Sequence, residues 1–210
     1  MITTARLCIA ALLVSMSLIV GCAAPVKEQA QAGFLSDYSK LEDADDNATR
    51  YVSPKLANYS TFMIDDVELL YTLDPEKPVF TDEEVEEIKT RIIGSLTAAL
   101  SKDGAYKIAY APAPGVGRIR VGITKLDETT GALNVLIWTK VTGAGLGGLA
   151  IESEMVDSMS GEQIVAATRW GTGSRVLRAG FTDTGDAMIL AEKWAKEFRK
   201  RLDKAHGVSK

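Results

Sequence analysis

The chain has little of the chemistry on which most metal and nucleophilic sites depend, because its 210 residues include only two cysteines and one histidine. This scarcity excludes most zinc sites built from thiolates and imidazoles, and most catalytic centres that pair a nucleophile with a histidine. Lys and Arg total 24 against 28 Asp and Glu, so no nucleic acid partner is expected. With 46% hydrophobic residues, the composition is globular and the length suits one domain.

The apolar run near the N-terminus, residues 7–20, is too short for a transmembrane helix, which needs ~20 residues. A basic start, an apolar centre of this length and small residues after it are typical of a secretory signal peptide. Residues 19–22 read Ile-Val-Gly-Cys, which resembles the lipobox of bacterial lipoproteins. The resemblance implies cleavage between Gly21 and Cys22 and acylation of Cys22. An ordinary signal peptide that contains a cysteine, or an uncleaved anchor, is the alternative.

Cleavage there would remove Cys8 and leave Cys22 as the single thiol, so no disulfide would be available. Acyl chains on Cys22, palmitate among them, would hold the protein on the lipid bilayer. Many such lipoproteins that stay in the inner membrane have Asp directly after the cysteine, whereas this chain has Ala23. By that resemblance we expect a lipid anchor in the cell outer membrane, with the protein facing the periplasm.

The rest of the sequence divides simply. We expect a cleaved signal peptide over residues 1–21, a lipidated cysteine with a flexible tether over 22–33, a single α+β domain over 34–207, and a tail over 208–210.

Two helices are predicted by apolar residues at steps of three and four. The first follows Thr81-Asp82-Glu83-Glu84, which has the spacing of a capping box, and is expected to stop at Gly104. The second is expected to start between Asp183 and Asp186 and to end before Gly207. The apolar stripe of the first is Val85, Ile88, Ile92, Leu96 and Leu100, and that of the second is Ala187, Leu190, Ala191, Trp194, Phe198 and Leu202.

Strands are predicted by alternation with a period of two, which is clearest over residues 118–124. A long strand is expected over 60–72 and a short one over 106–110. Residues 151–156 and 163–170 flank Asp-Ser-Met-Ser-Gly-Glu, which favours a hairpin whose turn places Gly161 at positive φ. The expected fold is an α+β two-layer sandwich, a mainly antiparallel sheet covered by two helices in the order β-α-β-β-β-β-α.

Four short segments together resemble a known family. They are the lipobox, Gly-Phe-Leu-Ser-Asp-Tyr-Ser-Lys-Leu at 33–41, Asp-Ser-Met-Ser-Gly-Glu at 157–162 and Ala-Glu-Lys-Trp-Ala at 191–195. Their order and spacing resemble the bacterial lipoproteins of domain of unknown function 3313. Because that family has no established activity, the resemblance implies fold and location but no chemistry.

Residues 143–148 match the pattern G-x-G-x-x-G, which holds a dinucleotide only between a parallel strand and a helix. A strand rather than a helix is expected downstream, so Gly143–Gly148 is interpreted as a mobile or close-packing loop, and no cofactor is expected. The acidic residues Asp43, Asp45 and Asp46 superficially match the start of a calcium loop. Ala48 and Pro54 stand where that loop needs Gly and Glu, so a solvated acidic loop is expected.

Glu152 and Glu154 lie two residues apart on an expected strand, ~6.6 Å apart along one face. That spacing is compatible with an acid–base pair on a glycan, although two solvated glutamates on an outer strand face are the commoner arrangement. Asp157 lies close by in the sequence. These three carboxylates are the candidates for a hydrolase that acts on cell-wall glycan or peptide.

The single histidine, His206, lies where the second helix is expected to end, and there it favours the negative end of the helix dipole. The basic residues of that helix serve the same dipole and solubility, or contact an acidic partner or an anionic glycan. They are Lys193, Lys196, Arg199, Lys200, Arg201 and Lys204. Trp170 and Trp194 are expected in the core.

These observations predict a non-enzymatic, lipid-anchored binding or accessory module whose partner is an envelope protein or peptidoglycan. No catalytic, cofactor or metal residue is assigned, and Cys22 is the one modification site. Two alternatives remain: a cell-wall hydrolase that uses the strand carboxylates, and a structural spacer between the outer membrane and the wall.

Overall fold

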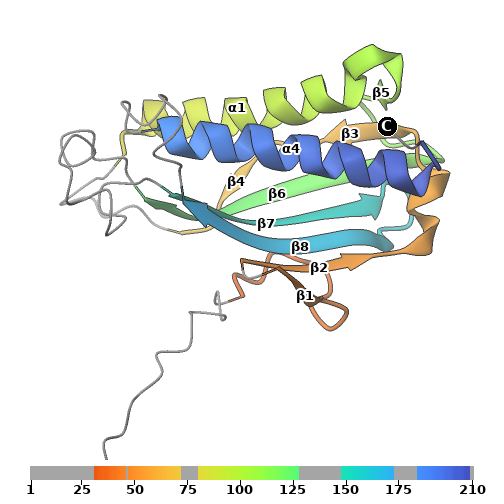
Figure 1. Ribbon diagram of the computed structural model, residues 1–210, viewed down its shortest axis with the longest axis horizontal. Helices are drawn as coiled ribbons and strands as arrows, with labels where there is room; N and C mark the ends of the chain where they lie inside the picture. Colours follow the sequence, from red (N-terminus) through yellow and green to blue (C-terminus); the bar gives the residue numbers. More distant parts are fainter. Residues whose placement is uncertain (1–30, 46, 72–79, 128–147, 173–183, 209–210) are drawn as a thin grey trace, which may run out of the picture.

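The computed structural model describes residues 31–45, 47–71, 80–127, 148–172 and 184–208. These residues form one mixed α+β fold, in which an open eight-stranded sheet carries two long helices on one of its faces (Figure 1). Among them, no helix is long and apolar enough to cross a bilayer.

The two helices are α1, Asp82–Ser101, and α4, Gly185–Ala205, and they pack side by side over the sheet (Figure 1). The predicted capping box is confirmed, because Thr81 Oγ1 accepts from Glu84 N at 3.2 Å and the Glu84 carboxylate accepts from Thr81 N at 2.8 Å. The predicted apolar stripes are buried, apart from a half-buried Phe198. Short 3-10 turns, η1 at Pro54–Asn58 and η2 at Lys102–Gly104, complete the helical elements of the described residues.

The strands combine an antiparallel half with a parallel half. In spatial order the sheet runs β1-β2-β8-β7-β6-β3-β5, with β4 also paired to β6. Pairs from β1 to β6 along this order are antiparallel, whereas β3 and β4 pair with β6 in parallel, and β5 pairs with β3 in parallel. The strands are β1 Glu42–Asp45, β2 Ala48–Val52, β3 Thr61–Ile64, β4 Glu68–Leu69, β5 Lys107–Ile108, β6 Val116–Asp127, β7 Gly148–Asp157 and β8 Gln163–Thr172.

Before the first helix the structure differs from the expected element order. Of the described residues, four strands rather than one precede α1, and four lie between α1 and α4. Two of them make a hairpin, β1–β2, from the acidic stretch that was expected to be a loop. The other two are pieces of the expected long strand, interrupted at Asp65, whose side chain turns to Arg118 with a distance of 2.8 Å between Oδ2 and Nε.

The main core lies between the helices and the sheet and is closed by large apolar side chains. Phe62, Ile88, Ile123, Ile164 and Leu202 have no exposed area. A second, smaller cluster lies on the opposite face, where Phe34 and Leu35 pack against Ala166. Residues 32–41 therefore form a cover of their own. They lie over part of the sheet face that carries no helix.

Candidate functional site

Glu152 and Glu154 are buried, and this corrects the expectation that they are solvated. The alternation of β7 places both on the sheet face opposite the helices, as expected, yet they are only 1% and 2% exposed. They are hidden because the segment that precedes β1 folds across this face, and nothing in the local pattern of β7 signals that cover. A buried carboxylate is costly unless hydrogen bonds or a cation compensate for its lost hydration.

Glu152 is compensated by the segment itself. Its carboxylate accepts from the backbone N–H of Ala32 at 2.7 Å and of Phe34 at 3.3 Å, and from the hydroxyl of Tyr38 at 2.5 Å. Burial, and then the hydrogen bond to Glu152, raises the pKa of Tyr38 above its usual value. The phenol is therefore held in its neutral form, which is the form that donates to the carboxylate.

Glu154 is compensated by both the sheet and the segment. Arg120, its register partner on β6, places Nη1 at 2.7 Å from Oε1. On the other oxygen the carboxylate accepts from Ser36 N at 2.9 Å, from Ser36 Oγ at 2.8 Å and from Gln163 Nε2 at 3.0 Å. Gln163 also donates to the carbonyl of Asp37 at 3.0 Å. We call this set of groups, Arg120, Glu152, Glu154 and Gln163 with residues 32–38, the N-terminal clasp.

Apolar contacts complete the clasp. The guanidinium of Arg120 lies 4.7 Å from the centre of the Phe34 ring. Beside it, Gly122 leaves room for the cover, since a Cβ there would lie 3.2 Å from the Phe34 ring and 2.3 Å from a methyl group of Leu70. Position 122 therefore has to be small for the segment and the chain around Leu70 to reach the sheet.

The chemistry open to this arrangement is structural. A general acid or base must reach the proton that it transfers, directly or through one water molecule. The oxygens of Glu152 and Glu154 instead accept seven hydrogen bonds and charge-assisted contacts from the protein itself. Every oxygen of the two carboxylates thus accepts from the protein itself, and both side chains are buried.

Asp157, the third candidate carboxylate, shapes the predicted hairpin turn. Its Oδ1 accepts from Met159 N at 3.1 Å and from Ser160 N at 2.8 Å, and its Oδ2 accepts from the hydroxyl of Tyr59 at 3.0 Å. The hydrogen bond from the Ser160 backbone is the main cause that lowers the pKa of Asp157. Gly161 adopts φ +73°, as the turn prediction requires.

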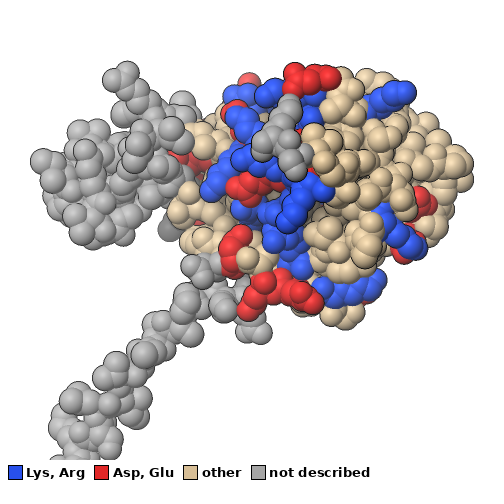
Figure 2. All heavy atoms as spheres, turned by 45° about the vertical axis from the view of Figure 1, so that its right-hand side comes forward, with Lys and Arg blue, Asp and Glu red and all other residues tan. Residues whose placement is uncertain are grey.

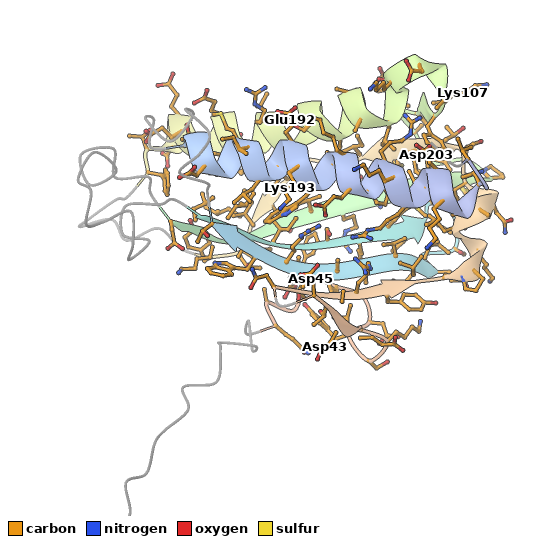
Figure 3. All side chains as sticks on the ribbon, viewed as in Figure 1. Asp43, Asp45, Lys107, Glu192, Lys193 and Asp203 are labelled. Carbon is orange, nitrogen blue, oxygen red and sulfur yellow. The ribbon has the colours of Figure 1, made fainter. Side chains whose placement is uncertain are left out.

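Asp43 and Asp45 belong to strand β1 at the edge of the sheet (Figure 3). The solvated acidic loop is thus wrong in its conformation, because the stretch forms the hairpin β1–β2. Within the described ranges, no group of three or more His, Cys, Asp or Glu side chains is placed to hold a metal ion. Of Gly143–Gly148, Gly148 begins β7 and the other positions lie outside the described residues, as do Gly21, Cys22 and Asp46.

His206 lies at the end of α4, as expected, and its Nε2 is 3.0 Å from the carbonyl oxygen of Tyr59. Figure 2 shows Lys and Arg side chains gathered in a band, with carboxylates between them. Part of this charge is used within the protein. Lys196 pairs with Glu192 on α4, and Arg199 donates to the carbonyl of Ala99 at 2.8 Å near the end of α1.

The two tryptophans that were expected in the core differ in their burial. Trp194 is 8% exposed and belongs to the core, as expected, whereas Trp170 is 37% exposed and the expectation for it is wrong. Trp170 lies on β8, next to Gly171, whose Cβ position faces Leu190 and Trp194 of α4. Because strand side chains alternate, Trp170 points to the opposite face, away from the helices.

A cavity of about 110 Å³ lies between α4 and the sheet, and sequence patterns do not indicate it. Its walls are apolar side chains from both layers, with Trp194 and Phe198 above and Leu149, Ile151 and Met155 below. Three arginines, Arg50, Arg169 and Arg201, also line it. Arg50 and Arg169 each stand two residues from an alanine, Ala48 and Ala167, which places them on the same strand face as a small apolar residue. The sequence does not show that the two strands pair with each other.

Comparisons with known proteins place the chain in a family without assigning it an activity. No curated protein matches it. Among solved structures, it is similar to a PelC dodecamer subunit from Paraburkholderia phytofirmans, with 16% identity over 74% of this chain and 95% of that one and a TM-score of 0.46. It is also similar to the hypothetical protein CT253 from Chlamydia trachomatis, with 12% identity over 71% and 99% of the two chains and a TM-score of 0.33.

At such identities and TM-scores, nothing about activity, partner or assembly is transferred from these structures. The sequence match is more direct, because one family model covers residues 30–198, which include the clasp, most of both helices and the whole sheet. The chain belongs to the family of proteins of unknown function DUF3313.

Proposed function

We propose that this chain is a lipid-anchored module of the cell envelope that binds another envelope component and catalyses no reaction. Acylated Cys22 holds it on the outer membrane, and the domain faces the periplasm at the end of the tether. The partner is an envelope protein or peptidoglycan. The lipobox pattern and Ala23 carry the anchoring part of the proposal, together with membership in the family.

The N-terminal clasp is the observation that favours a tethered binding module over an enzyme. Its first hydrogen bond comes from Ala32, at the end of the expected tether, and goes to Glu152 in the middle of the sheet. A pull on the tether would therefore act on a strand with neighbours on both sides rather than on a frayed edge. The same contacts occupy the two glutamates that a hydrolase of this chain would need.

The anchoring proposal is tested by fractionating cells that carry the full chain with Cys22→Ser. Cys8→Ser is the matched control, because Cys8 lies in the segment that cleavage would remove. We expect wild type and Cys8→Ser to sediment with the outer membrane and to have a diacylglyceryl group on Cys22 by mass spectrometry. We expect Cys22→Ser to lose both. Outer-membrane sedimentation of Cys22→Ser, or an unmodified Cys22 in wild type, would overturn the proposal.

The partner is tested by crosslinking in living cells and by incubating the purified lipoprotein with peptidoglycan. A specific crosslinked envelope protein, or retention on insoluble peptidoglycan without release of fragments, supports the binding role. Release of soluble fragments that Glu152→Gln abolishes would support the hydrolase instead. Normal envelope behaviour after replacement of residues 34–207 by an inert fold of similar size would favour a spacer.

A further inference from the structure

The cavity between α4 and the sheet combines two properties that are rarely found together by chance: apolar walls and a cluster of arginines. From this combination we infer that the cavity binds a single-chain anionic amphiphile, with its alkyl chain inside and its carboxylate or phosphate head on Arg50, Arg169 and Arg201. This inference rests on the proposed binding role, because it requires that the domain bind a ligand, and it adds the chemical class of that ligand. It is independent of the lipid on Cys22.

The cavity exists because small residues face each other across the two layers. Ser153 and Ala167 are register partners on β7 and β8, and both line the cavity from below. Ala191 and Ala195 of α4 line it from above. Well-packed interiors leave few voids larger than a water molecule, so four small residues around one space mark a place that the chain does not fill itself.

The size and polarity of the space suit an alkyl chain. Its volume of about 110 Å³ is smaller than the apolar cavity of roughly 150 Å³ that accepts benzene, so it has room for part of an alkyl chain. Each CH₂ group that leaves water for such surroundings contributes ~0.8 kcal/mol to binding. Ala167 and Arg50 line the cavity and are only half-buried, so the cavity opens to solvent on the side of β2.

The arginines come from three elements and meet at the same place. Arg50 belongs to β2, Arg169 to β8 and Arg201 to α4. Arg50 lies opposite Ala167 in the sheet, and Ala48 lies opposite Arg169. The guanidinium of Arg169 stacks 5.2 Å from the centre of the Trp194 ring, which joins the charged group to the apolar wall.

Carboxylates lie beside these arginines. Glu197 lies 2.5 Å from Arg169 and 4.0 Å from Arg201, Glu42 is the register partner of Arg50, and the charge of Asp45 acts on Arg201. Glu154 also lines the cavity, but it is paired with Arg120. Burial, and after it the charges of Arg50 and Arg169, lowers the pKa of Arg201, so the three cations repel one another. An anion at this point would relieve the repulsion, and the planar guanidinium groups suit a carboxylate or a phosphate.

The test uses quenching of Trp194, which lines the cavity, by 8-bromooctanoate. The full-length protein is kept in a non-ionic detergent, and Trp194→Phe reports the quenching of the other tryptophans. The matched probe is 8-bromooctanol, which has the same bromine and chain but no charge. We expect saturable quenching of Trp194 by 8-bromooctanoate, with half-saturation at a concentration at least tenfold lower than for 8-bromooctanol, and displacement by octyl phosphate.

Three variants locate the site. Arg50→Gln and Arg201→Gln should each raise the half-saturating concentration of 8-bromooctanoate at least fivefold. Ala167→Leu should abolish the saturable phase by filling the cavity, with its melting temperature as the check on folding. Lys193→Gln, on the exposed side of the same helix, should leave binding unchanged (Figure 3).

Equal half-saturation by the two brominated probes, quenching that does not saturate, or unchanged affinity in both arginine variants would overturn the inference. So would displacement of 8-bromooctanoate by a short acidic peptide at lower concentration than by octanoate, because the arginines would then serve a protein partner. Each of these outcomes leaves the fractionation of Cys22→Ser as it was, so failure here is distinguishable from failure of the anchoring proposal.

Discussion

Arg120 and Glu154 are register partners on β6 and β7, and 2.7 Å separates Nη1 of the arginine from Oε1 of the glutamate. The glutamate side chain has no exposed area, whereas the arginine is 30% exposed. The pair joins the centre of the sheet to residues 32–38 of the clasp, because Glu154 also accepts from Ser36 N. This relationship makes the energetic role of the clasp measurable.

Removing the charge of Glu154 should destabilise the fold. Glu154→Gln removes the buried carboxylate beside Arg120, which keeps the exposed Glu68 at 3.9 Å, and places an amide where Ser36 and Gln163 donate. We expect the free energy of unfolding in urea to fall by about 2–3 kcal/mol. Glu162→Gln breaks the exposed pair with Lys55 and should cost clearly less, because solvent screens the two charges. Equal losses for the two variants would show that the clasp contributes little.

An added methyl group should lower the stability of the fold on the clasp face and raise it on a helix surface. Gly122→Ala places a Cβ 2.3 Å from a methyl group of Leu70, and we expect a loss of about 1–3 kcal/mol in unfolding free energy. A methyl group on Gly94, which is exposed on α1, would point into open space, with no other side chain within 4 Å. Gly94→Ala should therefore gain up to about 1 kcal/mol. Thermal or urea unfolding distinguishes these opposite signs.

Alkaline pH should weaken the fold through its buried tyrosines. Burial first, and then Asp157 or Asp203, raises the pKa of Tyr59 and of Tyr106 to about 12. Because the folded state holds these protons more tightly than the unfolded state, stability is fully present below pH 10 and falls as the pH rises from 10 to 12.

Absorbance of the ionised phenol gives the pKa values, and urea unfolding at successive pH values gives the stability. In Tyr59→Phe, which keeps the ring but cannot ionise, the fall in stability with pH should be shallower. A fall of the same steepness would mean that other groups cause it.

The sequence predicts best what depends on near neighbours. The capping box at Thr81 and Glu84, the apolar stripes of α1 and α4 and the turn before Gln163 are all encoded within a few residues, and each is confirmed. The period of β7 also predicts correctly that Glu152 and Glu154 share a face.

What the sequence does not predict depends on pairing between distant segments. The alternation along β7 does not indicate which segment covers its polar face, because the groups that bury Glu152 lie 114 to 120 residues away. The hairpin β1–β2 is missed for a related reason. Its acidic residues favour a loop locally, but they pair with β2, which is held in the sheet by the distant strand β8. The three cavity arginines likewise meet only in the folded chain.

The account depends most on Glu152 and Glu154 holding residues 32–38 on the sheet rather than acting on a substrate. Hydrogen exchange at the amides of Ala32, Phe34 and Ser36 measures this directly. We expect these amides to be protected in wild type and in Glu162→Gln, and Glu152→Gln to speed exchange at Ala32 and Phe34 at least tenfold. Exchange at the rate of an unstructured peptide in wild type, or unchanged protection in Glu152→Gln, would contradict the account.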